Sequence, residues 1–161
     1  MNQKPTNGAL LILLTVLSGC TFERYTLPAR RAVANALTVA QQRGHVVMET
    51  EDLLLGLVAA DPELVERVRS QVGFTSDAIA VGIDRLAPAR PRNGEAQAGL
   101  PLSPHLKEVL DHAAADSADR VTTRDLLLAL LLGPGVAGQV LKELGVTDGV
   151  VRAVAETSQD A

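Results

Sequence analysis

Three side chains in the second half of the chain have the types and spacing of a hydrolytic site. His112 and Asp116 lie four residues apart, which would put them on one face of a helix, and Ser117 follows directly. A serine nucleophile needs a base that is held by a third group in a pocket. The sequence shows no turn motif that would expose such a serine. We therefore interpret His112 and Asp116 as a solvated pair on a helix surface, and we expect no enzyme.

The other chemically active residues are scattered. Cys20 is the only cysteine, so no intrachain disulfide can form, and the histidines lack histidine or cysteine partners at ligand spacing. We expect no metal and no cofactor. A phosphate-binding loop needs a Gly-Lys pair, and the sequence has none. With a net charge of −4 and scattered Lys and Arg residues, we also expect no binding of nucleic acid.

An eight-residue motif occurs twice in the chain. Residues 50–57 read TEDLLLGL and residues 123–130 read TRDLLLAL, so that Glu51 of the first copy becomes Arg124 in the second. Leucines at nearly every position predict a helix that is buried all round. Thr50 and Thr123 are predicted to cap the two versions of this helix.

The composition favours helices throughout. Apolar residues make up 47% of the chain and aromatic residues only 2%, so the core must be built from Leu, Val, Ile and Ala. Apolar residues recur at helical spacing from Thr26 to Arg43, with Gly44 after the last turn. Further helix starts are predicted at Asp61, at Thr75 or Ser76, and at Ser103 and Thr147. The expected fold class is therefore all-α, with about eight helices.

These helices form a tandem repeat. We predict repeat one over residues 22–86, a linker rich in proline and glycine over 87–101, repeat two over 102–156 and a polar tail over 157–161. Repeat two is four residues shorter between its first and second helices, and we place the loss opposite residues 44–47. Each unit is too small to bury its own core, so we expect the two to pack together with pseudo-twofold symmetry.

Residues 1–21 differ in character from the rest. Lys4 precedes an apolar run over residues 9–17, and Ser18-Gly19-Cys20 follows. This order is typical of a secretory signal, and it would make Cys20 a candidate for lipidation. The alternatives are an apolar N-terminal extension or a start site placed too far upstream. The membrane is an expected partner only if Cys20 is lipidated.

Several of these motifs together resemble a known family. FERYT at 22–26, RRAV at 30–33, GH at 44–45 and TEDLLLGL resemble the N-terminal repeat domain of Clp-type AAA+ unfoldases. GPGVAGQVLKELGV at 133–146 is similar to the closing segment of that family's second repeat. The likeness covers roughly residues 22–156. The family usually has Glu-His after the threonine of the repeated motif, whereas this chain has Glu51-Asp52 and Arg124-Asp125.

The resemblance implies a stand-alone form of this domain, without ATPase modules. Such a form would bind substrates, adaptors or the protease machinery in the cytoplasm and would have no chemistry of its own. It could act as an adaptor, a substrate receptor or a decoy of the Clp system. The alternative is an exported, lipid-anchored helical interaction domain with unrelated partners.

The resemblance also implies sites for phosphorylated arginine on substrates, which some members of the family carry in each repeat. The glutamate of the repeated motif meets the guanidinium, and the threonine that opens the repeat helps to hold the phosphate. The matching residues are Thr26 and Glu51 in the first repeat, and Ser103 and Arg124 in the second. Arg124 would repel a guanidinium, so we expect the second site to be inactive or to take a plain anion. Alternatively, Glu51 serves only the helix dipole.

Overall fold

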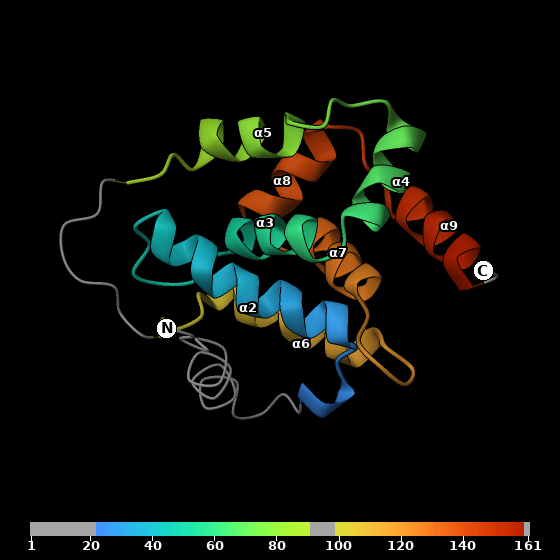
Figure 1. Cartoon of the computed structure of the whole chain (residues 1–161), viewed down its shortest axis with the longest axis horizontal. Helices are drawn as coiled ribbons and strands as arrows, with labels where there is room; N and C mark the ends of the chain where they lie inside the picture. Colours follow the sequence, from blue (N-terminus) through green and yellow to red (C-terminus); the bar gives the residue numbers. More distant parts are fainter. Residues whose placement is uncertain (1–21, 91–98, 160–161) are drawn as a thin grey trace, which may run out of the picture.

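The fold is all-α, as the composition predicts. The computed structural model describes residues 22–90 and 99–159, and within these ranges it contains eight α-helices, one short 3-10 helix and no strand (Figure 1). The elements are η1 (Phe22–Arg24), α2 (Leu27–Gln42), α3 (Thr50–Ala60), α4 (Pro62–Val72), α5 (Ala78–Leu86), α6 (Pro104–Asp116), α7 (Thr123–Leu132), α8 (Val136–Glu143) and α9 (Asp148–Gln159). Cys20 and the apolar segment around it lie outside the described residues.

The predicted tail and the predicted linker are both more closely tied to the domain than the sequence suggests. Helix α9 continues to Gln159, so the predicted polar tail begins inside the last helix. The predicted linker is anchored on the domain at both ends. Arg90 N–H donates to the Arg43 carbonyl (3.0 Å), and Leu100 is buried in the core. Among the described residues no single helix is long and apolar enough to cross a membrane, and α7 with α8 qualifies only as a pair bent by 89°.

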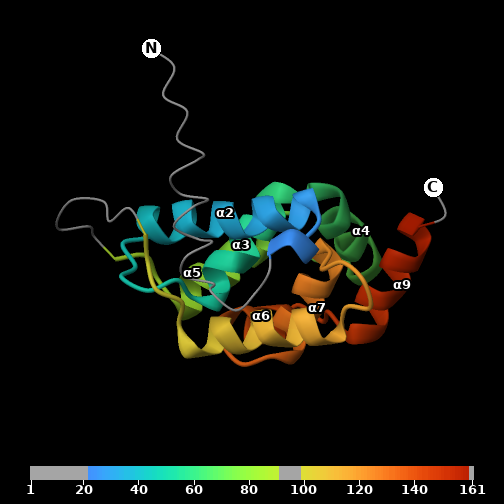
Figure 2. The same ribbon diagram turned by 90° about the horizontal axis from the view of Figure 1, so that it is seen from below.

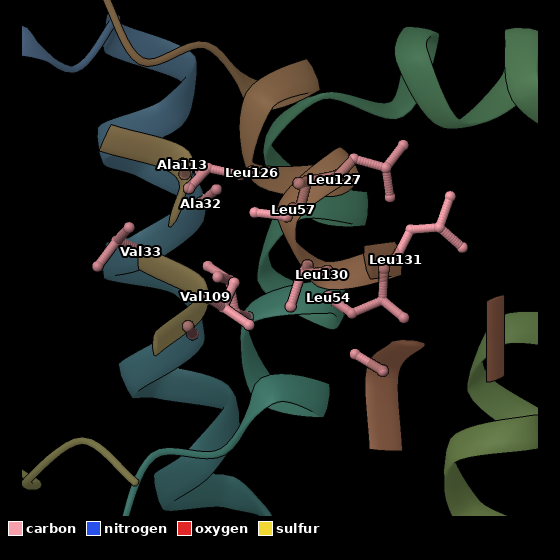
Figure 3. Packing of buried hydrophobic residues seen from close by; sticks show 14 of the residues in the cluster. Ala32, Val33, Leu54, Leu57, Val109, Ala113, Leu126, Leu127, Leu130 and Leu131 are labelled. Atoms are coloured by element: carbon pink, nitrogen blue, oxygen red, sulfur yellow. The ribbon is translucent and has the colours of Figure 1, made fainter. Parts of the chain in front are cut away.

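The two leucine-rich helices α3 and α7 lie at the centre of the molecule. In the view of Figure 1, α2 and α6 lie below this central pair, one in front of the other, and the other helices lie above it and beside it. Leucines of α3 and α7 lie next to one another in the core (Figure 3). On the side of α2 and α6 they meet smaller residues, such as Ala32 of α2 and Val109 and Ala113 of α6. The leucines at matching positions of the two helices are buried to within 2% of complete: Leu53, Leu54 and Leu57 in α3, and Leu126, Leu127 and Leu130 in α7. One shared core therefore spans both repeats.

The outer helices cross from one repeat to the other. Helix α5, the fourth of repeat one, packs on α8, the third of repeat two, and α9 packs on α4 in the same way. Figure 2, turned by 90°, shows α2 and α6 on opposite sides of the central pair. Each repeat thus covers the other, which is why the predicted pseudo-twofold arrangement forms a single domain.

Two isolated parallel bridges tie the starts of the helices together across the repeats. Tyr25, just before α2, pairs with Val121, just before α7. Leu102, just before α6, pairs with Met48, just before α3. The backbone N–H···O hydrogen bonds of the two bridges are well formed, at 2.8–3.0 Å. Each helix that opens one repeat therefore begins beside the central helix of the other repeat.

The caps of the central helices lie one residue earlier than predicted. Glu49 is the N-cap of α3 and Thr122 that of α7, so Thr50 and Thr123 are the first residues inside these helices. The reason is the aspartate in the third helical position. Asp52 accepts from Glu49 N–H (2.9 Å) and Asp125 from Thr122 N–H (2.9 Å), which fixes the residue before the threonine as the cap.

The remaining helix starts follow the sequence with one exception. Thr26, Asp61, Ser103 and Thr147 accept hydrogen bonds from backbone N–H groups at the starts of α2, α4, α6 and α9. Helix α5 is instead preceded by Asp77 rather than by Thr75 or Ser76. The Thr75 hydroxyl bonds the Asp77 carboxylate (2.7 Å), which turns both side chains toward each other in the loop.

The four-residue difference between the repeats falls mainly in a helix. Helix α6 has 13 residues against 16 in α2, and the connection that follows it has one residue fewer. The placement of the whole loss opposite residues 44–47 is therefore wrong. The shorter α6 leaves the C-terminal turn of α2 without a helical counterpart in repeat two.

Candidate functional site

The repeated threonines reach across the pseudo-twofold axis. The Thr50 hydroxyl accepts a hydrogen bond from Ala137 N–H in the first turn of α8 (3.3 Å). The Thr123 hydroxyl bonds the carboxylate of Asp61 (2.7 Å), the residue that caps α4. Each threonine of a central helix therefore holds the start of a helix in the other repeat.

These contacts bring helix N-termini together in two places. Site one is the first turn of α3 with residues 101–103 and the start of α8. Site two is the first turn of α7 with residues 24–26 and the start of α4. In each site the starts of three helices are brought together in this way, and the positive ends of their dipoles favour negative charge there.

Site one nevertheless contains carboxylates at its centre. Glu51 is 5% exposed and Asp52 is fully buried. Burial is the main cause that raises the pKa of both carboxyls, against the opposing effect of backbone N–H groups. His45 Nδ1 lies 2.7 Å from Asp52 Oδ2, and Asp52 Oδ1 has no hydrogen-bond partner among the described residues. Glu51 forms no ion pair with any cationic side chain in the described part of the chain.

Site two differs in the charge of one residue. Arg124 occupies the position that Glu51 has in site one, is partly exposed, and forms no ion pair with any described carboxylate. Asp125 is held by the N–H and hydroxyl groups of Thr122 (2.9 and 3.0 Å). The Arg124 guanidinium and the helix N-termini favour an anion here, whereas the carboxylates of Asp61 and Asp125 oppose one.

The structure does not bring Thr26 and Glu51 together. Gly56 of α3 lies against Ala32 and Ala36 of α2, which follow Thr26 by six and ten residues, and Glu51 precedes Gly56 by five. Helices α2 and α3 run antiparallel (Figure 1), so the two offsets add up to about 16–22 Å at 1.5 Å per residue. One arginine side chain cannot touch both residues.

The parallel bridges pair these residues crosswise instead. Ser103 N–H donates to the Met48 carbonyl (2.9 Å), which brings Ser103 to the start of the helix that carries Glu51. Thr26 N–H donates to the Val121 carbonyl (3.0 Å), which brings Thr26 to the start of the helix that carries Arg124. Site one therefore combines Glu51 with Ser103, and site two combines Arg124 with Thr26.

The residues considered for hydrolysis are not arranged for it. His112 and Asp116 are exposed on α6, and no hydrogen bond joins them in the described structure. The Ser117 hydroxyl is taken up by the Arg24 guanidinium and the Ala114 carbonyl at the end of α6. No group of three or more His, Cys, Asp or Glu side chains within the described ranges could hold a metal ion.

The sequence reasoning missed the contact between His45 and Asp52. It considered His45 as a possible metal ligand and assigned it no partner. A histidine after Gly44 and an aspartate in the first turn of the next helix were both visible. What could not be read was that the connection between α2 and α3 folds His45 back over that turn.

The comparisons with known proteins agree with this fold. The model of the Clp repeat (R) N-terminal domain matches residues 24–144. A ClpA homologue of Cyanidium caldarium, named as an ATP-binding subunit of an ATP-dependent Clp protease, is 28% identical over 99% of this chain. The chloroplastic chaperone ClpC2 of Oryza sativa subsp. japonica is 28% identical over 86% of it. The chain spans only 21% and 16% of these two relatives.

Solved structures show the same architecture. The N-terminal domain of ClpD from Arabidopsis thaliana superposes with a TM-score of 0.66 at 26% identity, covering 86% of this chain and 99% of that one. The Hsp104 N-terminal domain from Candida albicans shares the fold, with a TM-score of 0.64 at 19% identity over 81% of this chain and 88% of that one. Since the family model covers most of the chain, the protein belongs to the Clp repeat N-terminal domain family.

Proposed function

We propose that this domain is a non-catalytic binding module of a Clp protease system, which captures proteins that carry phosphorylated arginine. The observation that carries the proposal is site one, where a buried glutamate without a counter-charge lies at converging helix N-termini. A carboxylate pairs with a guanidinium through two charge-assisted hydrogen bonds, while helix N-termini favour the attached phosphate. Phosphoarginine presents both groups on one side chain.

Within site one, the partner of Glu51 is Ser103 rather than Thr26. Ser103 is buried, and its hydroxyl accepts from Leu106 N–H (3.0 Å) at the start of α6. A serine hydroxyl also has a proton to donate, and a phosphate oxygen is a suitable acceptor. The revised site thus takes the guanidinium on Glu51 and the phosphate beside Ser103 and the first turn of α6.

Site two is proposed to reject phosphoarginine. Arg124 would face the guanidinium of the ligand with a like charge at the same place where Glu51 would attract it. Thr26 and the starts of α2, α4 and α7 leave the site suited to a simple anion. The chain should therefore hold one phosphoarginine site, although it has two sites of the same architecture.

Calorimetric titration with phosphoarginine tests this assignment. We expect one site per chain, which is lost in Glu51→Gln and weakened in Ser103→Ala, but is kept in the matched variants Arg124→Gln and Thr26→Ser. Free arginine and inorganic phosphate, titrated separately, should each bind more weakly than the joined ligand. Two equivalent sites, or a site that survives Glu51→Gln, would overturn the proposal.

The role within the protease system follows from where the captured protein goes. As an adaptor or receptor, the domain would speed the degradation of an arginine-phosphorylated substrate by a Clp-type unfoldase and its protease. As a decoy it would slow that degradation, and Glu51→Gln would abolish either effect. The comparisons and the described residues offer no support for the lipid-anchored alternative, and Cys20 lies outside the described ranges.

A further inference from the structure

Two adjacent carboxylates lie in the first turn of α3, but only Asp52 has a basic side chain in contact with it, that of His45. We infer that His45 is a specificity-determining residue of site one, which neutralises Asp52 from inside the protein and leaves Glu51 as the carboxylate open to a cationic ligand. This inference rests on the proposed function of site one. His45 is a positioning residue in this role, since it acts on the ligand through the charge that it compensates.

The geometry assigns separate tasks to the two carboxylates. Both contacts of Asp52 go to Oδ2, which bonds His45 Nδ1 (2.7 Å) and the N–H of Glu49 (2.9 Å). The Asp52 side chain is fully buried and that of His45 is 12% exposed, so the contact is shielded from water. Oδ2 therefore serves the cap and the histidine, whereas Oδ1 is buried without a hydrogen-bond partner among the described residues.

No other cation can replace His45 in this place. Arg43 lies near enough to lower the pKa of Asp52 slightly, but its guanidinium bonds Asp84 (2.8 Å) and the Ala87 carbonyl. The negative charge of Glu49 raises the pKa of Glu51 further. The neighbouring segments contact the start of α3 through uncharged residues: Gly135 and Ala137 contact Thr50, and Ser103 bonds Met48.

Removal of the histidine should make the two carboxylates compete for one proton. Neighbouring buried carboxylates without a counter-charge cannot both ionise easily, so they take up a proton as a pair. A cationic ligand then has to displace that proton, and its affinity falls as the pH is lowered. Burial already raises the pKa of both groups, so the proton is taken up at a higher pH than for exposed carboxyls.

Site two supports the assignment by contrast. Asp125 also caps its helix, but it is held by the Thr122 hydroxyl and N–H and has no histidine beside it. There the neighbouring residue is Arg124. Each site therefore has one cation next to its capping aspartate, and the difference lies in whether that cation also occupies the ligand position.

The test combines His45→Gln with Asp52→Asn. Gln can still donate a hydrogen bond but carries no charge. For the phosphoarginine probe we expect His45→Gln to lower the affinity about tenfold at pH 6.5 and to recover toward the wild-type value at pH 8, as for a coupling of about one pK unit. The double variant His45→Gln/Asp52→Asn should bind like the wild type at both pH values, because a neutral amide in place of the buried carboxylate needs no counter-charge.

Carboxyl NMR titration of the full chain separates the possible failures. In His45→Gln we expect the Glu51 and Asp52 signals to titrate together and at a higher pH than in the wild type. Unchanged titration, or a loss of affinity that Asp52→Asn does not rescue, would show that His45 is only structural. If the carboxyl titration shifts as expected but wild-type protein binds no phosphoarginine, the proposed function fails while the counter-charge role of His45 stands.

Discussion

The two central helices agree in their cores and differ in their first turns. Leu54 of α3 and Leu127 of α7 occupy matching positions, and both are buried. At the second residue of each helix, Glu51 in α3 corresponds to Arg124 in α7, and the charge is reversed. Packing against a shared core restricts the leucines of both copies, whereas nothing in the core depends on the sign of the charge at the helix start. The ends of these helices can therefore change their ligand without changing the fold.

The central helices also differ in how closely a partner approaches. Gly56 of α3 lies against the backbone of α2, where an added Cβ would come within 2.4 Å of the Ala32 carbonyl oxygen. The matching residue of α7 is Ala129, which is 8% exposed. Helix α3 is thus pressed against its neighbour without a side chain between them, and α7 keeps one more methyl group at the same place.

Substitutions in the shared core should have the largest effect on the stability of the protein. Leu54→Asp or Leu127→Asp would put an unpaired carboxylate among leucines, and we expect either variant to lose the cooperative fold. Even the milder change of a buried leucine to alanine costs about 2–5 kcal/mol, a large share of the stability of a typical domain. Circular dichroism during thermal unfolding would measure this loss.

Leu132→Asp is the matched control for that experiment, since Leu132 ends the same helix but is 57% exposed. It should unfold close to the wild-type temperature. If Leu127→Asp left the signal of repeat one intact and removed only that of repeat two, the two repeats would not share one core.

The close approach of α2 and α3 gives the next largest effect. In an exposed helix Gly→Ala stabilises by about 1 kcal/mol, but Gly56→Ala should destabilise by about 1–3 kcal/mol because its Cβ meets backbone atoms that cannot move away alone. The matched change Ala129→Gly should cost only about 1 kcal/mol. Urea unfolding of both variants would measure the difference, and a stabilising Gly56→Ala would contradict the tight contact.

Most of the elements could be predicted because their signals are local. Asp61 before Pro62, and Gly73 after the last turn, mark both ends of α4 without any knowledge of its neighbours. The repeated leucines identified the buried pair and, through the repeat, the pseudo-twofold core. The errors at the starts of α3 and α7 were local too, since an aspartate three residues after a polar residue also predicts the earlier cap.

The partners within each site could not be predicted in the same way. The sequence gives the order of the helices, and it suggested that Thr26 and Glu51 of one repeat form one site. In the structure it is Ser103 that lies at the start of the helix that carries Glu51, because the segment before α6 pairs with the segment before α3. Such a bridge of single residue pairs has no periodic pattern. Only the packing of the two repeats decides which helix starts meet.

The threonines that reach across the repeats provide a third prediction. Thr50→Val keeps the shape of the side chain but leaves the buried Ala137 N–H without an acceptor, which should cost about 1–2 kcal/mol. Thr123→Val breaks the bond to Asp61 and should cost a similar amount. Here the substitution lies in repeat two, and the helix start that loses its partner lies in repeat one. Thermal unfolding would measure both.

Thr38→Val, at an exposed position of α2, is the control and should stay within about 0.5 kcal/mol of the wild type. If the two buried variants were as stable as this control, the repeated threonines would not hold the helix starts of the opposite repeat. A loss in the double variant that equals the sum of the two would show that the two contacts act independently.

The smallest effects should come from the charges that distinguish the two sites. Burial raises the pKa of Glu51 above its ordinary value, so the folded state binds the proton more tightly than the unfolded chain. Stability due to this group therefore falls as the pH rises from the ordinary carboxyl pKa through the raised pKa of Glu51, and the cost is complete above the raised pKa. Glu51→Gln should make the protein slightly more stable than the wild type at pH 7, and this gain should vanish on acidification below about pH 4.

Arg124→Gln should also stabilise slightly, by about 0.3–1 kcal/mol, because it removes a positive charge from a helix N-terminus. The guanidinium does not titrate in this range, so its gain should be the same at about pH 4 and pH 7. Urea unfolding of both variants at the two pH values would compare them directly. If Glu51→Gln destabilised the protein at pH 7, Glu51 would serve the helix dipole of α3, and no ligand would be needed to explain why a carboxylate is kept in this buried place.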